Sequence, residues 1–163
     1  MQTKIAKPDE KEVEELMQCL NRAYSGERNA YCSWWYLSKI VTGKGYEDLS
    51  YYIEKIAKDE EKHAGALAVR IFELGGVPPI VPLYADKTDE HFYLPKEQMV
   101  YNDLVRTIVT AEEISRDIYV ELIEKTSGRD RDTWSLVNRL LEEETLHDKL
   151  FEDLPLFYWA TFA

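Results

Sequence analysis

Two short segments of the sequence pair a glutamate with a histidine three residues later: Glu60 with His63, and Glu144 with His147. Residues at positions i and i+3 of a helix project from the same face. Each pair can therefore offer one carboxylate and one imidazole to a common centre, and these groups are ligands for divalent metal ions. A single Glu-x-x-His motif is weak support, because charged helix faces also contain such pairs by chance.

Two further glutamates strengthen the interpretation, because they precede the two motifs by almost the same distance. Glu27 lies 33 residues before Glu60, and Glu112 lies 32 residues before Glu144. The chain thus resembles a doubled helix pair, in which each half has a lone glutamate followed by Glu-x-x-His. Charged residues scattered over solvated helix faces do not explain this regularity.

Apolar residues at helical spacing predict the four helices that would position these groups. The expected helices span about residues 8–41, 47–74, 95–127 and 132–153. On the inward stripes, ionisable residues replace apolar ones at Glu27, Glu60, His63, Glu144 and His147, whereas Glu112 lies at the margin of its stripe beside Leu104, Ile108, Ala111, Ser115, Ile118 and Leu122.

About twenty residues, GGVPPIVPLYADKTDEHFYL, separate the second and third expected helices. Fully extended, such a segment reaches about 65 Å, which exceeds the roughly 45 Å length of a thirty-residue helix. The second and third helices can therefore run parallel, while the other consecutive pairs turn tightly. We predict an all-α four-helix bundle with one long crossover, the connectivity of ferritin-like folds.

Acidic residues in the core of such a bundle require a physical reason. Without partners, buried carboxylates and imidazoles would cost several kcal/mol per charge. That cost is offset if they share cations, and four carboxylates balance two divalent ions. Di-iron and di-manganese bundle proteins use this donor set, with a lone Glu from each of two helices and Glu-x-x-His from each of the other two.

Composition and charge limit the remaining options. The 163 residues, 45% hydrophobic and 31% charged, suit one globular domain over 1–163, with a short apolar tail at 155–163 that is expected to dock on a neighbouring subunit or fold back on its own bundle. No apolar run approaches the roughly 20 residues of a membrane span, and the first ten residues do not resemble a signal peptide. The net charge of -11 disfavours binding to nucleic acid and to anionic membranes.

Cys19 and Cys32 are the two cysteines of the chain, and both fall in the first expected helix. Thirteen residues of helix separate them by about 20 Å, which is too far for a disulfide between them. This cysteine usage is typical of a reducing compartment, so a cytoplasmic location is expected.

Over about residues 13–154 the sequence resembles the bacterioferritin branch of the ferritin-like superfamily, and within it the Dps-like bacterioferritin relatives. The resemblance rests on SGERNAY around Glu27, DEEKHAGALAVRIFELGGVP around Glu60 and His63, AEEISRDIY around Glu112, and LLEEETLHDKLFEDL around Glu144 and His147. It implies that Glu60 and Glu144 bridge two metal ions. It also implies that Glu27 with His63 completes one metal position, and Glu112 with His147 the other.

Four positions depart from the patterns of related families. Bacterioferritins bind haem through a Met directly after the bridging Glu of the second helix, but Glu61 stands there, so no haem is expected. Rubrerythrins have another Glu three residues after the third-helix ligand, where this chain has Ser115, and they add a C-x-x-C rubredoxin segment that the sequence lacks. Some Dps-like relatives carry a cysteine pair where this chain has Ile114 and Trp134.

The resemblance implies a ferroxidase for iron storage or detoxification. Two Fe(II) ions per chain would bind, with Mn or Zn as alternative metals, and O2 or H2O2 would oxidise the iron. A homo-oligomer, either a cage or a dimer, is expected. The alternative is a rubrerythrin-like peroxidase or a di-iron oxygenase that acts on a non-iron substrate, which a fold alone does not exclude. A DNA-protecting binder is disfavoured by the acidic charge and the absence of a basic arm.

Four aromatic residues fall near the expected site in helical phase: Tyr24, Tyr31, Trp34 and Tyr119. Core packing is the favoured role, because aromatic side chains commonly fill bundle cores. A redox role, in which they supply electrons when one iron is missing, is the alternative. His91 is expected in the exposed crossover.

Overall fold

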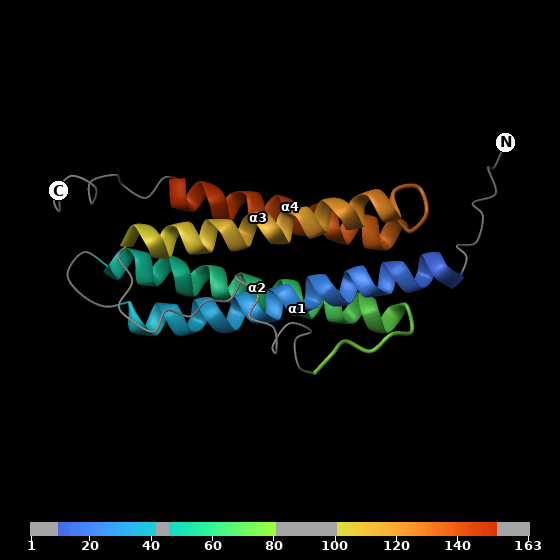
Figure 1. Ribbon diagram of the computed structural model, residues 1–163, viewed down its shortest axis with the longest axis horizontal. Coiled ribbons are helices and arrows are strands. Elements are labelled where there is room, and N and C mark those ends of the chain that lie inside the picture. Colours follow the sequence, from blue (N-terminus) through green and yellow to red (C-terminus); the bar gives the residue numbers. More distant parts are fainter. Residues whose placement is uncertain (1–9, 42–45, 81–100, 153–163) are drawn as a thin grey trace.

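The structure is a computed structural model that describes residues 10–41, 46–80 and 101–152. These residues form four helices and no strand: α1 (Glu10–Ile40), α2 (Glu47–Glu73), α3 (Tyr101–Thr126) and α4 (Arg131–Glu152). The helices lie lengthwise beside one another in an elongated bundle (Figure 1). The predicted all-α four-helix fold is confirmed.

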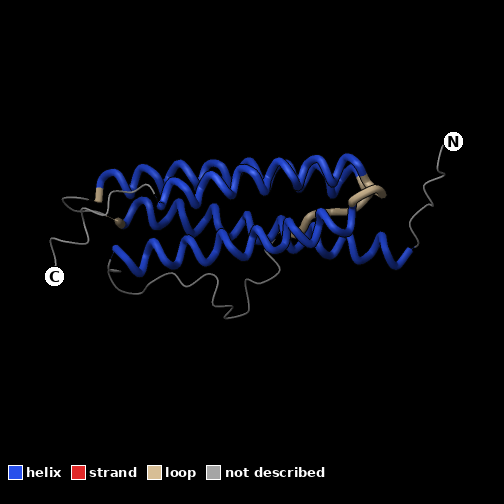
Figure 2. Tube along the Cα trace, turned by 90° about the horizontal axis from the view of Figure 1, so that it is seen from above, coloured by secondary structure: helices blue, strands red, loops and turns tan. Residues whose placement is uncertain are grey.

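The direction of the helices also agrees with the prediction. α2 and α3 run in the same direction, while α1 runs opposite to α2 and α4 runs opposite to α3 (Figure 1). α1 packs against α2 and α3, and α4 packs against α3 and α2. Figure 2 shows the same bundle after a quarter turn about its long axis. α2 ends and α3 begins at opposite ends of the bundle (Figure 1).

Three expectations fall on residues outside the described ranges. They are the start of the third helix near residue 95, the exposed position of His91, and the docking of the apolar tail at 155–163. They stay predictions.

The end of α2 is set by a glycine pair. Gly75 adopts a left-handed φ of 84°, which only glycine adopts without a steric penalty. Its N–H donates to the carbonyl of Phe72, and the N–H of Gly76 donates to the carbonyl of Ile71, each at 2.9 Å. This Schellman arrangement satisfies the last carbonyls of the helix and ends it.

The start of α4 is fixed by Asp130, which caps it and ties it to α2. Asp130 Oδ1 accepts a hydrogen bond of 3.1 Å from the backbone N–H of Thr133, as an N-cap carboxylate does. Both carboxylate oxygens of Asp130 also accept from Arg70 Nη2 on α2, each at 2.9 Å. This contact fixes the axial position of α4 against α2, and α2 and α4 carry the two Glu-x-x-His motifs.

The apolar core is divided into two clusters of buried side chains. The first consists of Ala30, Trp34, Leu37, Leu49, Ile53, Ile56, Ala57, Leu104 and Ile108. The second consists of Cys19, Leu20, Ala23, Leu67, Ile71, Tyr119, Leu122, Val137 and Leu140. Along α1, α2 and α3 the candidate ligands Glu27, Glu60, His63 and Glu112 lie between members of the two clusters, whereas α4 contributes only to the second cluster, which precedes Glu144 and His147.

The apolar stripe of α3 is turned relative to the prediction. Glu112, expected at the margin, is only 2% exposed, whereas Ala111, Ser115 and Ile118, expected inward, are half-buried. The reason is that the polar centre itself occupies this part of the core, so the helix directs Glu112 and Tyr119 inward. The burial of Glu112 therefore exceeds what its place at the edge of the stripe predicted.

Two further features of the described helices bear on the expectations. None of these helices is long and apolar enough to span a membrane. Cys19 is buried and Cys32 is exposed, and both thiols are free, so the predicted absence of a disulfide between them is confirmed.

Candidate metal centre

All six ionisable residues expected in the core meet in the middle of the bundle. The most exposed of them, His147, has 4% of its surface accessible. The group comprises Glu27 from α1, Glu60 and His63 from α2, Glu112 from α3, and Glu144 and His147 from α4. Each helix therefore contributes at least one carboxylate to a buried cluster.

The six residues form two overlapping sets of four. The first set is Glu27, Glu60, His63 and Glu144, and the second is Glu60, Glu112, Glu144 and His147. Within each set, one potential ligand atom from every residue lies within 4.8 Å of the others. Glu60 and Glu144 belong to both sets, so the two candidate positions are adjacent and share two carboxylates.

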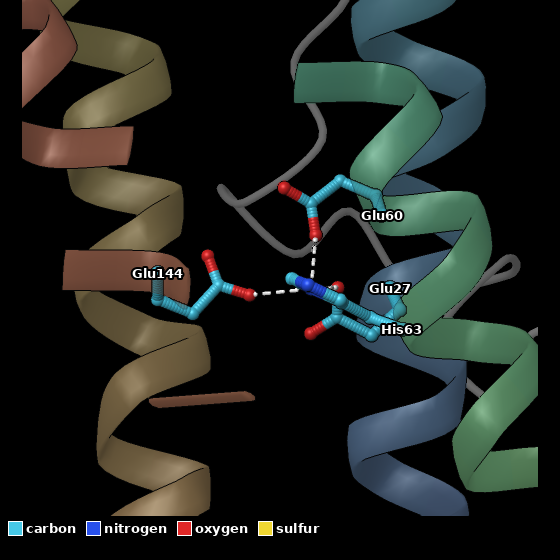
Figure 3. Close-up of side chains that lie close together, drawn as sticks. All are labelled: Glu27, Glu60, His63 and Glu144. Atoms are coloured by element: carbon cyan, nitrogen blue, oxygen red, sulfur yellow. Dashed lines mark hydrogen bonds and ion pairs between the residues drawn. The ribbon is translucent and has the colours of Figure 1, made fainter. Parts of the chain in front are cut away.

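In the first set, three carboxylates converge on one ring nitrogen. His63 Nδ1 lies 2.9 Å from Glu144 Oε1 and 3.2 Å from Glu60 Oε2, and 3.6 Å from Glu27 Oε2. Figure 3 shows these carboxylates directed toward the imidazole from three helices. A ring nitrogen carries at most one proton, so it cannot donate to three acceptors at once.

The second set repeats this arrangement around His147 Nδ1. Glu60 Oε1 and Glu144 Oε2 each lie 3.2 Å from that nitrogen, and Glu112 Oε2 lies 3.3 Å from it. The two imidazole rings are nearly parallel, with centroids 5.9 Å apart and 20° between their planes. The shared carboxylates thus direct one oxygen to each histidine.

Two of the buried carboxylate oxygens make no hydrogen bond: Glu27 Oε2 and Glu60 Oε1. Glu60 Oε1 is within 3.2 Å of His147 Nδ1, but the angles of that contact are not those of a hydrogen bond. Buried acceptors without donors are costly. A cation at each position would satisfy them, and a set of carboxylate and imidazole donors fits a divalent transition metal. The residues present therefore fit a two-metal site.

The acids of the cluster fall into two groups by pKa. Burial, together with the charge of Glu60, raises the pKa of Glu27 and of Glu112 well above the usual value. Burial also acts to raise the pKa of Glu144 and of Glu60. For Glu144 hydrogen bonds to the two histidines outweigh burial, and for Glu60 the close contacts with Glu27 and the two histidines do, so both pKa values are lowered. The two shared carboxylates are thus shifted toward the ionised form, and the two outer ones toward the protonated form.

The pKa values of the two histidines are raised, although burial acts to lower them. Burial alone would lower their pKa, but hydrogen bonds to the surrounding glutamates outweigh it. Hydrogen bonds to Glu112 and Glu144 and the close carboxylate of Glu60 raise the pKa of His147 to about 12, and the carboxylates around His63 raise its pKa in the same way. In the metal-free cluster, protons on the two histidines therefore supply positive charge beside the carboxylates.

Three side chains outside the predicted ligand set contact it. The Tyr119 hydroxyl donates to Glu27 Oε1 at 2.6 Å, and burial with the nearby charges of Glu27 and Glu144 raises the pKa of this phenol. Glu143 and Asp59 face the outer ring nitrogens of His63 and His147. Sequence reasoning missed these two acids, although each directly precedes the Glu of a Glu-x-x-His motif.

The other aromatic residues flagged in the sequence pack in the core. Trp34 is part of the first apolar cluster, and half-buried Tyr31 packs against it. Half-buried Tyr24 packs against the second cluster. These positions agree with the packing role, whereas Tyr119 combines packing with a polar contact to the site.

Comparison with known proteins gives the same family. The family model of the ferritin-like domain matches residues 17–154. A DNA protection during starvation protein from Pyrococcus furiosus is 32% identical over 145 residues, which is 88% of this chain and 78% of that protein. The dodecameric thioferritin of Bacteroides fragilis, a bacterioferritin-related protein, is 30% identical with a TM-score of 0.78, covering 86% of this chain and 84% of that one. The bacterioferritin of Desulfovibrio desulfuricans has the same fold, with a TM-score of 0.76 at 23% identity, covering 91% of this chain and 82% of that one. By this match and by its four helices, the chain belongs to the ferritin-like family.

Proposed function

We propose that the chain is a di-iron ferroxidase that serves iron storage or detoxification. The observation that carries the proposal is the split of the shared carboxylates. Glu60 and Glu144 each direct one oxygen toward His63 and the other toward His147. This arrangement supports two adjacent positions for Fe(II) substrate ions, with Glu27 and Glu112 as outer ligands. Pairs of bridged ions lie about 3.5–4 Å apart.

The reaction oxidises the substrate iron and reduces the oxidant. Two Fe(II) ions each give one electron, and O2 with two protons becomes H2O2, or H2O2 with two protons becomes two waters. Oxygen ligands favour Fe(III) over Fe(II), because hard carboxylates suit the more highly charged ion. The chain's own acids can give up the protons that they hold in the metal-free cluster as iron enters.

The charge balance of the site supports two divalent ions. Four glutamates carry four negative charges when ionised, which equal the charge of two Fe(II) ions. In the absence of iron, bound protons offset the negative charge of the glutamates. The raised pKa values of Glu27, Glu112 and both histidines favour the binding of these protons. Iron binding is therefore an exchange of protons for metal.

The relatives support self-association. The bacterioferritin-related protein of Bacteroides fragilis is a dodecamer, and we propose a homo-oligomer for this chain. The name of the Pyrococcus furiosus relative concerns DNA protection. For this chain the net charge of -11 argues against direct binding of phosphate backbones, so removal of Fe(II) and peroxide is the proposed route to any such protection. A single domain over residues 1–163 and a cytoplasmic location stay predictions.

The test is an anaerobic addition of Fe(II) to the metal-free chain, followed by stopped-flow mixing with O2 or H2O2. Ferroxidase activity requires fast oxidation at two iron ions per chain and retention of Fe(III) by the protein. The matched variants are Glu144→Ala, which removes a carboxylate from both positions, and Glu142→Ala, which changes an exposed glutamate two residues earlier. Peroxide consumption that continues with an organic reductant, without retained Fe(III), would instead favour the rubrerythrin-like alternative.

A further inference from the structure

The end of the bundle at which α3 turns into α4 contains a cleft that is partly lined by apolar side chains. Its volume is about 540 Å³, which lies in the range of about 300–1,000 Å³ for sites that bury small ligands. The apolar part of the lining consists of Val13, Leu16 and Met17 from α1 and Leu74 at the end of α2. Val13 is 42% exposed, and the other three are half-buried. Apolar surface therefore remains open at this end of the bundle.

The charged side chains that line the cleft balance one another. Four are acidic and four are basic. Three ion pairs join six of them: Arg129 Nη1 with Glu12 Oε1 at 3.1 Å, Arg70 Nη2 with Asp130 Oδ2 at 2.9 Å, and Lys125 Nζ with Glu15 Oε2 at 3.6 Å. An occupant of this cleft does not have to supply a charge, so an uncharged apolar segment suits it better than an ion does.

The apolar tail at 155–163 has this character. It contains no charged residue, and three consecutive aromatic residues run from Phe157 to Trp159. The other stretches outside the described ranges, residues 1–9, 42–45 and 81–100, each contain at least one lysine. Large aromatic side chains that fill pockets are the usual anchors of protein interfaces. The tail therefore matches the chemistry of the cleft better than these other stretches do.

The tail is too short to fill the cleft of its own chain. α4 begins beside the cleft at Arg131 and ends at Glu152, at the opposite end of the bundle (Figure 1). The helix between these two residues is about 32 Å long. Trp159 is seven residues beyond Glu152, so it extends at most about 25 Å from the end of α4. The occupant must therefore come from another copy of the chain.

We propose that the apolar tail of one chain docks in this cleft of a second copy, with Phe157 and Trp159 as its anchors. In an extended segment these two side chains lie on the same side. Each chain has one tail and one cleft, so each copy both supplies and receives a tail, and such contacts can close into a symmetric assembly. This inference rests on the proposed homo-oligomer and does not depend on the oxidation of iron.

The test is photo-cross-linking from the tail of the full chain. The photoreactive amino acid p-benzoylphenylalanine is incorporated in place of Trp159, and isotope-labelled and unlabelled chains are assembled together. Mass spectrometry then distinguishes cross-links between copies from cross-links within one chain. Cross-links from position 159 to residues 13–17 or to Leu74 of a differently labelled chain are expected. Cross-links only within one chain, or only to a surface away from the cleft such as exposed Trp35, would overturn the inference.

Sedimentation velocity over a range of concentrations gives a second readout. Trp159→Ala is expected to raise the Kd of assembly about 10-fold or more, as the loss of an aromatic anchor does. Val13→Lys places a charge in the apolar lining and is expected to have a similar effect. Because the two side chains meet in the proposed complex, the double variant should lose less than the sum of the two single losses. Fully additive losses would overturn the inference.

The matched control is Val120→Lys. Val120 lies on α3 outside the cleft and is 44% exposed, close to the 42% of Val13. This variant adds the same charge at a similar exposure, so it is expected to leave the Kd of assembly unchanged. A loss equal to that of Val13→Lys would show a general effect of the added charge and would overturn the inference.

The remaining outcomes distinguish the inference from the proposed function. If the unaltered chain is a monomer at every concentration, the proposed homo-oligomer fails and the inference fails with it, while iron oxidation is still tested by stopped-flow mixing. If the unaltered chain assembles and both Trp159→Ala and Val13→Lys assemble as tightly, only the inference is overturned. If circular dichroism shows that Val13→Lys does not fold, the cross-linked positions decide.

Discussion

The Tyr119 hydroxyl on α3 donates a hydrogen bond of 2.6 Å to Glu27 Oε1 on α1, and both side chains are buried. This contact joins two helices directly beside the carboxylate cluster. The other oxygen of Glu27 has no hydrogen-bond donor. Tyr119 therefore stabilises Glu27, the outer glutamate of the first candidate position, in the metal-free chain.

Removal of this hydroxyl is expected to destabilise the metal-free chain. Tyr119→Phe should lower the free energy of unfolding by about 1–2 kcal/mol, because it leaves a second buried oxygen of Glu27 without a donor. Urea unfolding of the metal-free protein measures the change. The control is Tyr31→Phe at a half-buried position, where a change within about 0.5 kcal/mol is expected. Equal losses in the two variants would show that the contact has no special role.

The bundle and its polar centre could be predicted from the sequence because both depend on periodic signals. The helical spacing of apolar residues gives the stripes, and the matched spacings from Glu27 to Glu60 and from Glu112 to Glu144 place one acid per helix. The inward face of a helix is predicted from its apolar residues alone, however. The predicted direction of that face is therefore wrong where the core is polar. For this reason Glu112 is more deeply buried than its place at the margin predicted.

The contacts at the outer nitrogens could not be predicted in the same way. Glu143 and Asp59 lie on the solvent side of their helices, where acids are common and carry no signal. Which histidine each one reaches depends on the axial offset of α2 and α4. That offset is set by packing and by contacts such as Arg70 with Asp130, which connect residues far apart in the sequence.

The number of metal ions is the first prediction for the site as a whole. Anaerobic titration with Fe(II) is expected to saturate at two ions per chain, because the shared glutamates complete two sets of four ligands. Saturation at one ion, with all six residues intact, would contradict the two-position interpretation. Glu144→Ala is expected to weaken both ions, since Glu144 belongs to both sets.

Metal binding is expected to stabilise the fold. A ligand that binds only the folded chain adds about 2.7 kcal/mol at a concentration one hundred times its Kd. For a domain of this size, such a gain raises the Tm by roughly 5–10 °C. Melting curves with and without Co(II) under anaerobic conditions measure the shift. An unchanged Tm at saturating metal would argue against a buried site.

The stability of the metal-free chain is expected to fall as the pH rises. The pKa values of Glu27, Glu112 and His63 are raised in the folded state, and that of His147 is raised to about 12. The folded chain then binds more protons than the unfolded chain above the unfolded values of 4.5 for glutamate and 6.5 for histidine. Stability is therefore lost with increasing pH in this window.

The lowered pKa values of Glu60 and Glu144 do not offset this loss, because their contribution is complete above the unfolded value of 4.5. Urea unfolding of the metal-free chain at about pH 6 and about pH 8 measures the effect, with lower stability expected at the higher pH. With saturating Co(II) in place of the protons, the same comparison should show a smaller decrease. A rise in metal-free stability between these values would show that the cluster does not hold protons.

Glu112 and Glu113 are adjacent in sequence and opposite in environment, which makes them the sharpest pair for mutation. Glu112 is 2% exposed and lies 3.3 Å from His147 Nδ1, whereas Glu113 is exposed. Glu112→Ala is expected to remove a ligand from the position of His147 and to slow Fe(II) oxidation strongly. Glu113→Ala should change the free energy of unfolding by no more than about 0.5 kcal/mol and leave oxidation intact. Stopped-flow oxidation of the two variants side by side decides between them, and a slow Glu113→Ala with a fast Glu112→Ala would show that α3 presents the other acid to the site.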